Sequence, residues 1–300
     1  MQSVSTAPID RLRSTDPKGP VAFFATPAYA GCHPLYMRSL LESTRELCAR
    51  GWRVQHTWSI HQALIHNARE ELFGQFLASG ADWMFMIDSD IGWEATLPLR
   101  IASFNEPVVC VPVPGRSLNL PRATKSGRMQ DALSYYMLDD RDEARTRLAG
   151  ARRSLWNDPL PSASGIISST LDRFFEIDSS GAAWFAMRRD AALLLAEKHP
   201  ELSIHVADTR SWALFQPLVE NGTHWGEDIS FFARWRRLPE GGRIWCCATA
   251  TLSHSGPVTI VGNLARAVEE PESEEPILRS WPYEKTARRG DLPDEDGDTP

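Results

Sequence analysis

Short apolar runs alternate with amphipathic segments along the first third of the chain. Predicted strands cover residues 21–25, 53–58, 83–87 and 108–113. Predicted helices, recognised by the helical spacing of Leu, Ala and Phe, cover residues 35–50, 62–79 and 94–104. Strands that alternate with helices predict an α/β protein built on a largely parallel sheet.

The rest of the chain has a less regular pattern. Strands are predicted at residues 174–177, 182–187, 243–247 and 251–253, and helices at 190–198 and in the second part of 224–238. Tyr135, Tyr136 and Leu138 hint at a helix, whereas Asp158-Pro159-Leu160-Pro161-Ser162 is predicted to be a loop. We find no internal repeat and expect a single domain over residues 19–268.

The two ends of the chain differ from this domain. Residues 1–18 are polar without a clear period, and we expect them to form a flexible arm. Residues 269–300 hold eleven Asp/Glu and four Lys/Arg, a net charge of −7 that equals the charge of the whole chain. We therefore expect a disordered acidic tail on a nearly neutral body.

A basic excess lies inside the body. Residues 116–153 carry nine Lys/Arg against five Asp/Glu. This excess either faces an anionic substrate or acceptor, or belongs to a solvated helix surface. The surrounding segment, 115–170, is treated as an insert that lies near the acceptor site.

Composition narrows the class of protein. Hydrophobic residues make up 42% of the chain, with 11 Trp and 12 Phe, which suffices for a large core. No apolar run reaches transmembrane length and no signal-peptide segment opens the chain, so we expect no transmembrane segment. Five cysteines without a CxxC pair predict a reduced, cytoplasmic protein without a structural zinc site, in which Cys246 and Cys247 are packing residues.

The segment from Asp82 to Asp90 carries the most informative motif. Its five apolar residues predict a strand that is buried on both faces and ends in Asp88-Ser89-Asp90. Ligands of open α/β sheets bind at the carboxyl ends of strands, where two carboxylates one residue apart can share a divalent cation. The first hypothesis is therefore a metal-assisted reaction on a phosphate-bearing substrate. The alternative is a solvated turn or a helix cap.

Two further segments supply candidate polar groups. Glu227 and Asp228 stand at a predicted helix start, where they either act as a base or orient an acceptor hydroxyl, or only favour the helix N-terminus. His254 follows a late strand and can supply a nitrogen ligand to the metal. Carboxylates, one imidazole and phosphate oxygens suit Mn²⁺, with Mg²⁺ as the alternative.

The end of the first strand is a candidate nucleotide contact. Thr26-Pro27-Ala28-Tyr29 is expected at the same sheet edge as Asp88, where Tyr29 either stacks on a base or packs. Arg69, in the helix before the Asp-Ser-Asp strand, either reaches a diphosphate or is a surface arginine.

The order of these motifs resembles the nucleotide-sugar-dependent glycosyltransferases of the GT-A fold. The resemblance spans roughly residues 20–265 and rests on Thr26-Pro27-X-Tyr29, Ser39-Leu40, Ala68-Arg69, Ile87–Ile91, Gly181–Arg189, Gly226-Glu227-Asp228 and His254-Ser255-Gly256. It implies a GT-A-like catalytic domain with a Rossmann-like, mostly parallel central sheet flanked by helices. Relatives often carry Arg-Asn where this chain has Arg69-Glu70, and residues 116–160 match no motif of the family.

The resemblance also implies a role for each matched residue. Asp90 would be the principal metal ligand, with His254 and Asp88 beside it, and the ion would be Mn²⁺ or Mg²⁺. Asp228 would be the catalytic base of an inverting enzyme, with Glu227 next to it. The expected contacts of the nucleotide-sugar donor are Thr26, Pro27, Tyr29, Arg69, Asp88, Ser89 and Trp184.

The implied activity is transfer of a sugar from a UDP- or GDP-sugar to an acceptor hydroxyl. The acceptor stays open among a glycan, a lipid-linked sugar, a protein, a small molecule and a hydroxylated base in DNA, and the product is inverted or retained. One alternative is a nucleotidyltransferase, although residues 26–31 offer no clear Gly-rich phosphate loop. Another is a non-catalytic nucleotide- or sugar-binding module with a structural metal.

Overall fold

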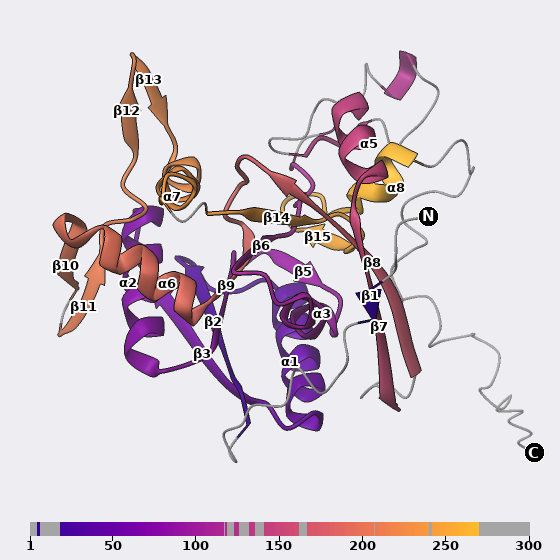
Figure 1. Ribbon diagram of the computed structural model, residues 1–300, viewed down its shortest axis with the longest axis horizontal. Helices are drawn as coiled ribbons and strands as arrows, with labels where there is room; N and C mark the ends of the chain where they lie inside the picture. Colours follow the sequence, from indigo (N-terminus) through magenta and orange to yellow (C-terminus); the bar gives the residue numbers. More distant parts are fainter. Residues whose placement is uncertain are drawn as a thin grey trace, which may run out of the picture.

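A nine-stranded mixed sheet forms the centre of the computed structural model, which describes residues 5–6, 19–116, 118, 123–125, 132–135, 141–161, 167–206, 208–239 and 242–269 (Figure 1). The strand order is β1-β7-β8-β14-β6-β9-β4-β2-β3. The strands of this sheet are β1 (Ser5–Thr6), β2 (Val21–Ala28), β3 (Arg53–Ile60), β4 (Trp83–Ile87), β6 (Val108–Cys110), β7 (Arg152–Pro161), β8 (Ile167–Ile177), β9 (Trp184–Arg188) and β14 (Ile244–Cys247).

The prediction of a largely parallel sheet is confirmed only in part. Parallel pairs join β1 to β7, β14 to β6, β4 to β2 and β2 to β3, whereas the other four neighbouring pairs are antiparallel. Strands β8 and β9 therefore run against the other seven. A strand buried on both faces has the same continuous apolar pattern in either direction, so the sequence of β9 did not reveal its reversal.

Successive residues of the central strands enter two separate cores, because side chains alternate across a strand. Phe23 and Met84 pack on the face covered by α2 (Ile65–Ser79), α6 (Arg189–Lys198) and α7 (Glu227–Arg236). Phe24 and Phe85 pack on the opposite face, with α1 (Pro34–Ala49) and α3 (Leu97–Phe104). The structure is thus an α/β arrangement with helices on both faces of the sheet.

Sequence signals explain where several helices begin and end. Pro34 opens α1, and the His33 side chain accepts a hydrogen bond from the Leu35 N–H at 3.2 Å. Helix α2 ends at Gly80, whose φ of 74° is the left-handed conformation that glycine adopts without strain. Pro98 lies in the first turn of α3, where its missing N–H costs no helical bond.

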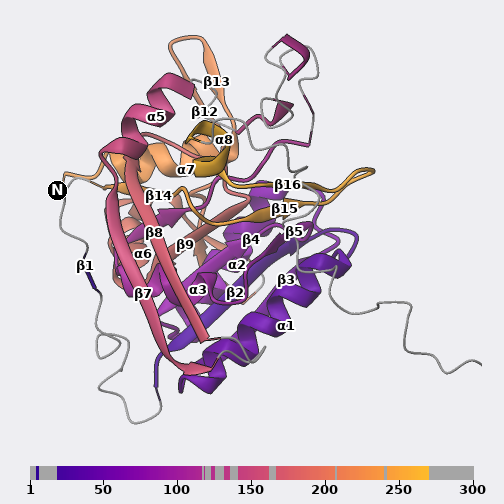
Figure 2. The ribbon, with the colours of Figure 1, turned by 90° about the vertical axis from the view of Figure 1, so that its right-hand side faces the viewer.

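Smaller sheets surround the central one. A three-stranded antiparallel sheet has the order β16-β15-β5, with β5 at Ile91–Trp93, β15 at Leu252–His254 and β16 at Ile260–Gly262 (Figure 2). Two hairpins consist of β10 (Ser203–Val206) with β11 (Thr209–Trp212), and of β12 (Leu218–Glu220) with β13 (Thr223–Trp225). The second hairpin projects from the body and leads into α7 (Figure 1).

The 115–170 segment is in large part a continuation of the central sheet. It supplies α5 (Arg141–Ala149), all of β7 and the beginning of β8. The loop prediction for Asp158–Ser162 is wrong over its first four residues, because β7 continues to Pro161. The β7–β8 register shifts between Asn157 and Pro161, and prolines, which cannot donate to a ladder, are tolerated at such an irregularity.

The remaining predictions for this region have mixed outcomes. Tyr135 forms an isolated bridge with Pro114, and Tyr136 and Leu138 lie outside the described residues. Ser5 and Thr6 of the expected arm pair with β7, and Glu269 is the last residue of α8 (Leu264–Glu269). The other residues of the arm and of the tail lie outside the described residues.

The expected packing role of two cysteines is confirmed, since Cys246 and Cys247 are buried on opposite faces of the sheet. Within the described part of the chain, no helix is both long enough and apolar enough to cross a membrane.

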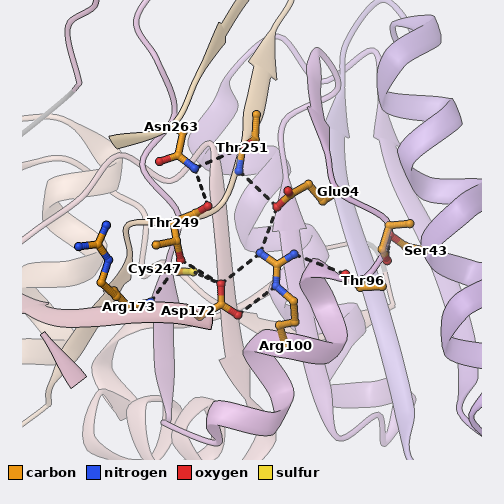
Figure 3. A network of polar contacts seen from close by, with 11 residues as sticks. Ser43, Glu94, Thr96, Arg100, Asp172, Arg173, Cys247, Thr249, Thr251 and Asn263 are labelled. Carbon is orange, nitrogen blue, oxygen red and sulfur yellow. Dashed lines mark hydrogen bonds and ion pairs between the residues drawn. The ribbon is translucent and has the colours of Figure 1, made fainter. Parts of the chain in front are cut away.

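Arg100, on α3, is the centre of a buried polar network (Figure 3). Its Nε and Nη2 donate to the two carboxylate oxygens of Asp172 at 3.0 and 3.2 Å, and Nη2 also reaches Glu94 Oε2 at 3.0 Å. Thr249 Oγ1 donates to Asp172 at 2.9 Å, and the Thr251 N–H donates to Glu94 at 3.3 Å. The network therefore ties the segment before β15 to the segment after β5.

The charge of Arg100 is balanced in spite of its burial. Burial alone would lower the pKa of this guanidinium, but Asp172 and Glu94 outweigh burial and raise it. Removal of one partner would leave a buried charge without compensation, which costs far more than the loss of an exposed pair.

We predict that Asp172→Ala lowers the free energy of unfolding by about 3 kcal/mol or more, because Arg100 loses its two-pronged partner. The matched control is Glu42→Ala, which breaks an exposed pair with Arg38 at 2.7 Å and should cost about 1 kcal/mol or less. Urea unfolding measures both variants. Equal losses would contradict a structural role for the network.

Candidate functional site

The carboxyl ends of β2 and β4 lie together at one edge of the central sheet. The two strands pair in parallel, with Ala25 opposite Met86. Pro27 and Tyr29 therefore emerge next to Asp88, as the sequence predicts. A pocket of about 480 Å³ opens at this edge.

Backbone hydrogen bonds hold the Asp-Ser-Asp turn in place. The Asp88 N–H donates to the Ala183 carbonyl at 2.9 Å, and the Ser89 carbonyl accepts from the His33 N–H at 2.8 Å. The Asp90 carbonyl accepts from the Ser255 N–H at 2.9 Å. The turn is therefore fastened to three other segments, unlike a solvated loop.

The pocket is lined by both acidic and apolar groups. Asp88 and Asp90 supply the carboxylates, and Tyr29 and Ile65 supply aromatic and aliphatic surface. Tyr29 is 60% exposed, so its ring is available to a flat ligand. The complete lining is Pro27, Tyr29, Ala30, Gly31, Gln62, Ala63, Ile65, Asp88, Ser89, Asp90 and Arg116.

His254 lies beside Asp90, a lining residue of this pocket, because β15 pairs with β5. The pairing sets His254 opposite Ile91, directly after Asp90. His254 Nε2 lies 3.7 Å from Asp90 Oδ2. The structure thus brings together the carboxylate and the imidazole that the sequence predicts to share a metal ion.

The ring of His254 is oriented by a second contact. Its Nδ1 lies 2.8 Å from the Pro114 carbonyl, which can only accept, so Nδ1 carries the proton and Nε2 presents a lone pair. Burial lowers the pKa of His254, which favours the neutral imidazole. A carbonyl behind a neutral imidazole is the usual support of a metal-binding histidine.

A guanidinium lies at the position that Asp90 and His254 share. Arg116 Nε donates to His254 Nε2 at 2.8 Å, and Arg116 Nη2 is paired with Asp90 Oδ2. The donor set therefore already accommodates a cation. A divalent ion would suit the same carboxylate and imidazole.

The protein supplies few side chains that could coordinate a metal ion at this position. Among the residues that the structure describes, no group of three or more His, Cys, Asp or Glu side chains is arranged to hold a metal ion. An ion held by Asp90 and His254 would take its other ligands from water or from a substrate such as a diphosphate, a common arrangement for Mg²⁺.

Arg69 connects the Asp-Ser-Asp turn to the start of α7. Its Nη2 donates to Asp88 Oδ1 at 3.0 Å, and its Nη1 donates to Glu227 Oε1 at 2.6 Å. The side chain is only 3% exposed. Burial opposes its charge, but Asp88 and Glu227 outweigh burial and raise the pKa of Arg69. Arg69 is therefore a fixed cation rather than a surface arginine.

Asp228 stands in the first turn of α7. Its Oδ1 accepts a hydrogen bond from the Ile229 N–H at 2.7 Å. Burial raises the pKa of Asp228, and the neighbouring Glu227 carboxylate raises it further, against the effect of the Ile229 N–H and Arg69. A half-buried carboxyl with a raised pKa is a stronger base than an ordinary aspartate.

Two residues expected to contact a donor have buried side chains. The Thr26 hydroxyl is paired with the hydroxyl of Tyr36, and both side chains are buried. Trp184 is fully buried and packs against Phe85 in a T-shaped arrangement, with the edge of one ring toward the face of the other. Neither Thr26 nor Trp184 is among the residues that line the pocket, and a direct ligand contact through either one stays a prediction.

Sequence reasoning missed Arg116 as a member of this site. Arg116 is the first residue of the basic 116–153 stretch and follows β6, which is parallel to β4 in direction. A position after the carboxyl end of such a strand was a usable signal. The β7–β8 hairpin of the same insert belongs to the other end of the sheet, between β1 and β14.

Comparisons with known proteins add no family. No protein-family model matches the chain, and no curated protein matches it. Among solved structures, the crystal structure of A197 from STIV is similar over 85% of this chain and 100% of that chain, with 15% sequence identity and a TM-score of 0.40. A likeness at this level carries no argument about function, so the site has to be judged on its own geometry.

Glu70, the neighbour of Arg69, has a carboxyl group whose pKa lies well above its ordinary value. It is buried, and Gln216 Nε2 lies 3.1 and 3.2 Å from its two oxygens. Burial raises its pKa to about 7, against the effect of Gln216 and of the charge on Arg234. The folded protein therefore holds this proton more tightly than the unfolded chain does.

We predict that Glu70 makes the protein less stable as the pH rises. The stabilising proton is fully present below the ordinary pKa of 4.5 and is lost as the pH passes about 7. Relative to Glu70→Gln, which does not titrate, the wild-type free energy of unfolding should fall over this range by up to about 3 kcal/mol. Urea unfolding at a series of pH values, with Glu42→Gln as the surface control, measures the difference. Parallel pH profiles for wild type and Glu70→Gln would contradict the prediction.

Proposed function

We propose that this chain is a glycosyltransferase that moves a sugar from a UDP- or GDP-linked donor to an acceptor hydroxyl, with the help of a divalent metal ion. The observation that carries the proposal is the meeting of Asp90 and His254 around one cation position. That position lies on the wall of an open pocket at the carboxyl edge of an α/β sheet.

The pocket supports this proposal by the mixed chemistry of its lining. Tyr29 and Ile65 suit a nucleobase, which binds by stacking and apolar contact. Asp88 and Asp90 suit a metal-bound diphosphate. A volume of about 480 Å³ lies in the usual range of small-ligand sites.

Each residue of the site would have a separate role in the reaction. Asp90 and His254 would hold Mn²⁺ or Mg²⁺, and Asp88, oriented by Arg69, would contact the ribose or the ion. When bound, the ion would neutralise the charge that develops on the leaving nucleotide. Because Arg69 also holds Glu227, the donor side and the start of α7 keep a fixed spacing.

Asp228 is the candidate base for an inverting reaction. Its raised pKa suits removal of a proton from an acceptor hydroxyl as the oxygen attacks the anomeric carbon. In a retaining reaction, Asp228 would instead position the acceptor. The hairpin β12–β13 leads into α7 and carries the well-exposed Val219.

We predict that the protein releases nucleotide from one class of donor in a metal-dependent way. A panel of UDP-, GDP- and dTDP-sugars is incubated with Mn²⁺ or with EDTA, and released nucleotide is measured. Asp90→Ala should abolish Mn²⁺-dependent nucleotide binding, whereas Asp178→Ala, which removes an exposed carboxylate outside the pocket, should leave it intact.

The outcomes of this panel separate the candidate functions. Metal-dependent binding of a nucleotide without release from any donor would favour a binding module. If the protein neither binds a nucleotide nor releases one from any donor, the proposed function is contradicted. An Asp90→Ala variant with unchanged nucleotide affinity would remove the metal assignment.

We predict that Asp228→Asn lowers the rate of donor hydrolysis by about 100-fold or more, because the attacking water loses the carboxylate that accepts its proton. Nucleotide affinity should change by less than about twofold, since the Asn oxygen can still accept from Ile229 and preserve the helix start. The matched control is Asp190→Asn in α6, where the carboxylate accepts from the Ala191 N–H at 2.9 Å in the same way. Full activity of Asp228→Asn would exclude the role of base.

A further inference from the structure

The backbone next to Arg116 is firmly anchored. The Pro114 carbonyl accepts from His254 Nδ1 at 2.8 Å, and Pro114 bridges to Tyr135. The Gly115 N–H donates to the Ser134 carbonyl at 2.8 Å, and a side chain at position 115 would collide with the Ser134 hydroxyl. These contacts hold the segment directly before Arg116 beside the site.

The side chain of Arg116 is exposed although the neighbouring backbone is held. It is 61% exposed, whereas Asp90 beneath it is 22% exposed. The guanidinium makes the contacts with Asp90 and His254, and Arg116 is one of the residues that line the open pocket. An exposed ion pair of this kind exchanges easily with solvent and is weak.

A guanidinium and a divalent ion cannot occupy the same position. Arg116 contacts Asp90 Oδ2 and His254 Nε2, the two atoms best placed to coordinate a metal. A bound metal therefore has to displace the guanidinium from both atoms. The displaced side chain stays tethered to the pocket wall, where it can reach an anionic ligand of the metal.

We propose that Arg116 is a displaceable internal cation. In the metal-free protein it neutralises Asp90 and shields His254. A divalent ion displaces it and is coordinated by both groups. Arg116 then becomes a positioning residue for the diphosphate of the donor. The first half of this inference concerns the metal alone, and the second half rests on the proposed function.

The test measures Mn²⁺ binding without nucleotide, by electron paramagnetic resonance of the free ion. Arg116→Gln should bind Mn²⁺ about fivefold more tightly than wild type, because the competing cation is gone. Arg116→Lys keeps the charge but cannot contact both atoms with a planar fork, so its affinity should fall between these two. The control Arg152→Gln, which breaks an exposed pair with Glu106, should match wild type.

Several results would overturn the displacement. Unchanged or weaker Mn²⁺ binding by Arg116→Gln would show that Arg116 supports the site instead of competing for it. Wild-type affinity of Arg116→Lys, beside a tighter Arg116→Gln, would show that charge repulsion acts without occupation. Circular dichroism of each variant checks that the fold is kept, so weaker binding cannot be assigned to unfolding.

A second measurement tests the diphosphate role with UDP and GDP as probes in saturating Mn²⁺. Arg116→Gln should bind the preferred nucleotide about fivefold more weakly, the opposite direction to its effect on the metal. Equal or tighter nucleotide binding would overturn this half. If Arg116→Gln tightens Mn²⁺ binding while no nucleotide binds at all, the displacement stands and the proposed function fails.

Discussion

The pairing of β15 with β5 is the contact on which the site depends. These strands come from distant parts of the chain, and their antiparallel register sets His254 beside Asp90. The buried Arg100 network holds the same two segments together, because it links Glu94, after β5, to Thr251, before β15. A polar network that is satisfied inside the protein specifies one arrangement of the segments around it. The position of the imidazole is therefore set by contacts beneath the pocket rather than by the pocket itself.

Much of the fold was predictable because, in the first third of the chain, the period of the apolar residues agrees with the glycines and prolines that mark the ends of elements. The stretch from β2 to α3 follows apolar runs and helical spacing, closed by residues such as Gly80. The reversal of β9 was not predictable, because a strand buried on both faces has no pattern that reports direction. Strand β5 is only three residues long, and β7 continues to Pro161 through an irregular register. In both cases, tertiary pairing outweighs the local signal.

The candidate site was predictable where strand order and chemistry coincide. Asp88 and Asp90 come directly after β4, whose carboxyl end lies beside that of β2, so an acidic turn at this edge could be expected from topology. His254 ends β15 in the smaller sheet, and its approach to Asp90 depends on the pairing of β15 with β5. The burial of Trp184 could not, because an apolar run does not tell which member reaches the surface. Arg116 was hidden in a stretch whose basic excess resembled a solvated surface, and its partners become evident only once β15 is placed beside β5.

Charge balance gives the edge of the sheet its chemical character. Arg69 is buried and bound to two carboxylates, so it cannot leave them for a ligand without stranding buried charges. Arg116 is the more exposed of the two guanidinium groups. The carboxylates gathered around these two are Asp88, Asp90, Glu227 and Asp228. When all four are ionised, the two arginines leave two negative charges, and displacement of Arg116 from Asp90 adds to the local deficit of positive charge. A divalent ion restores the balance at that place, and the guanidinium that it releases is then available to an anion.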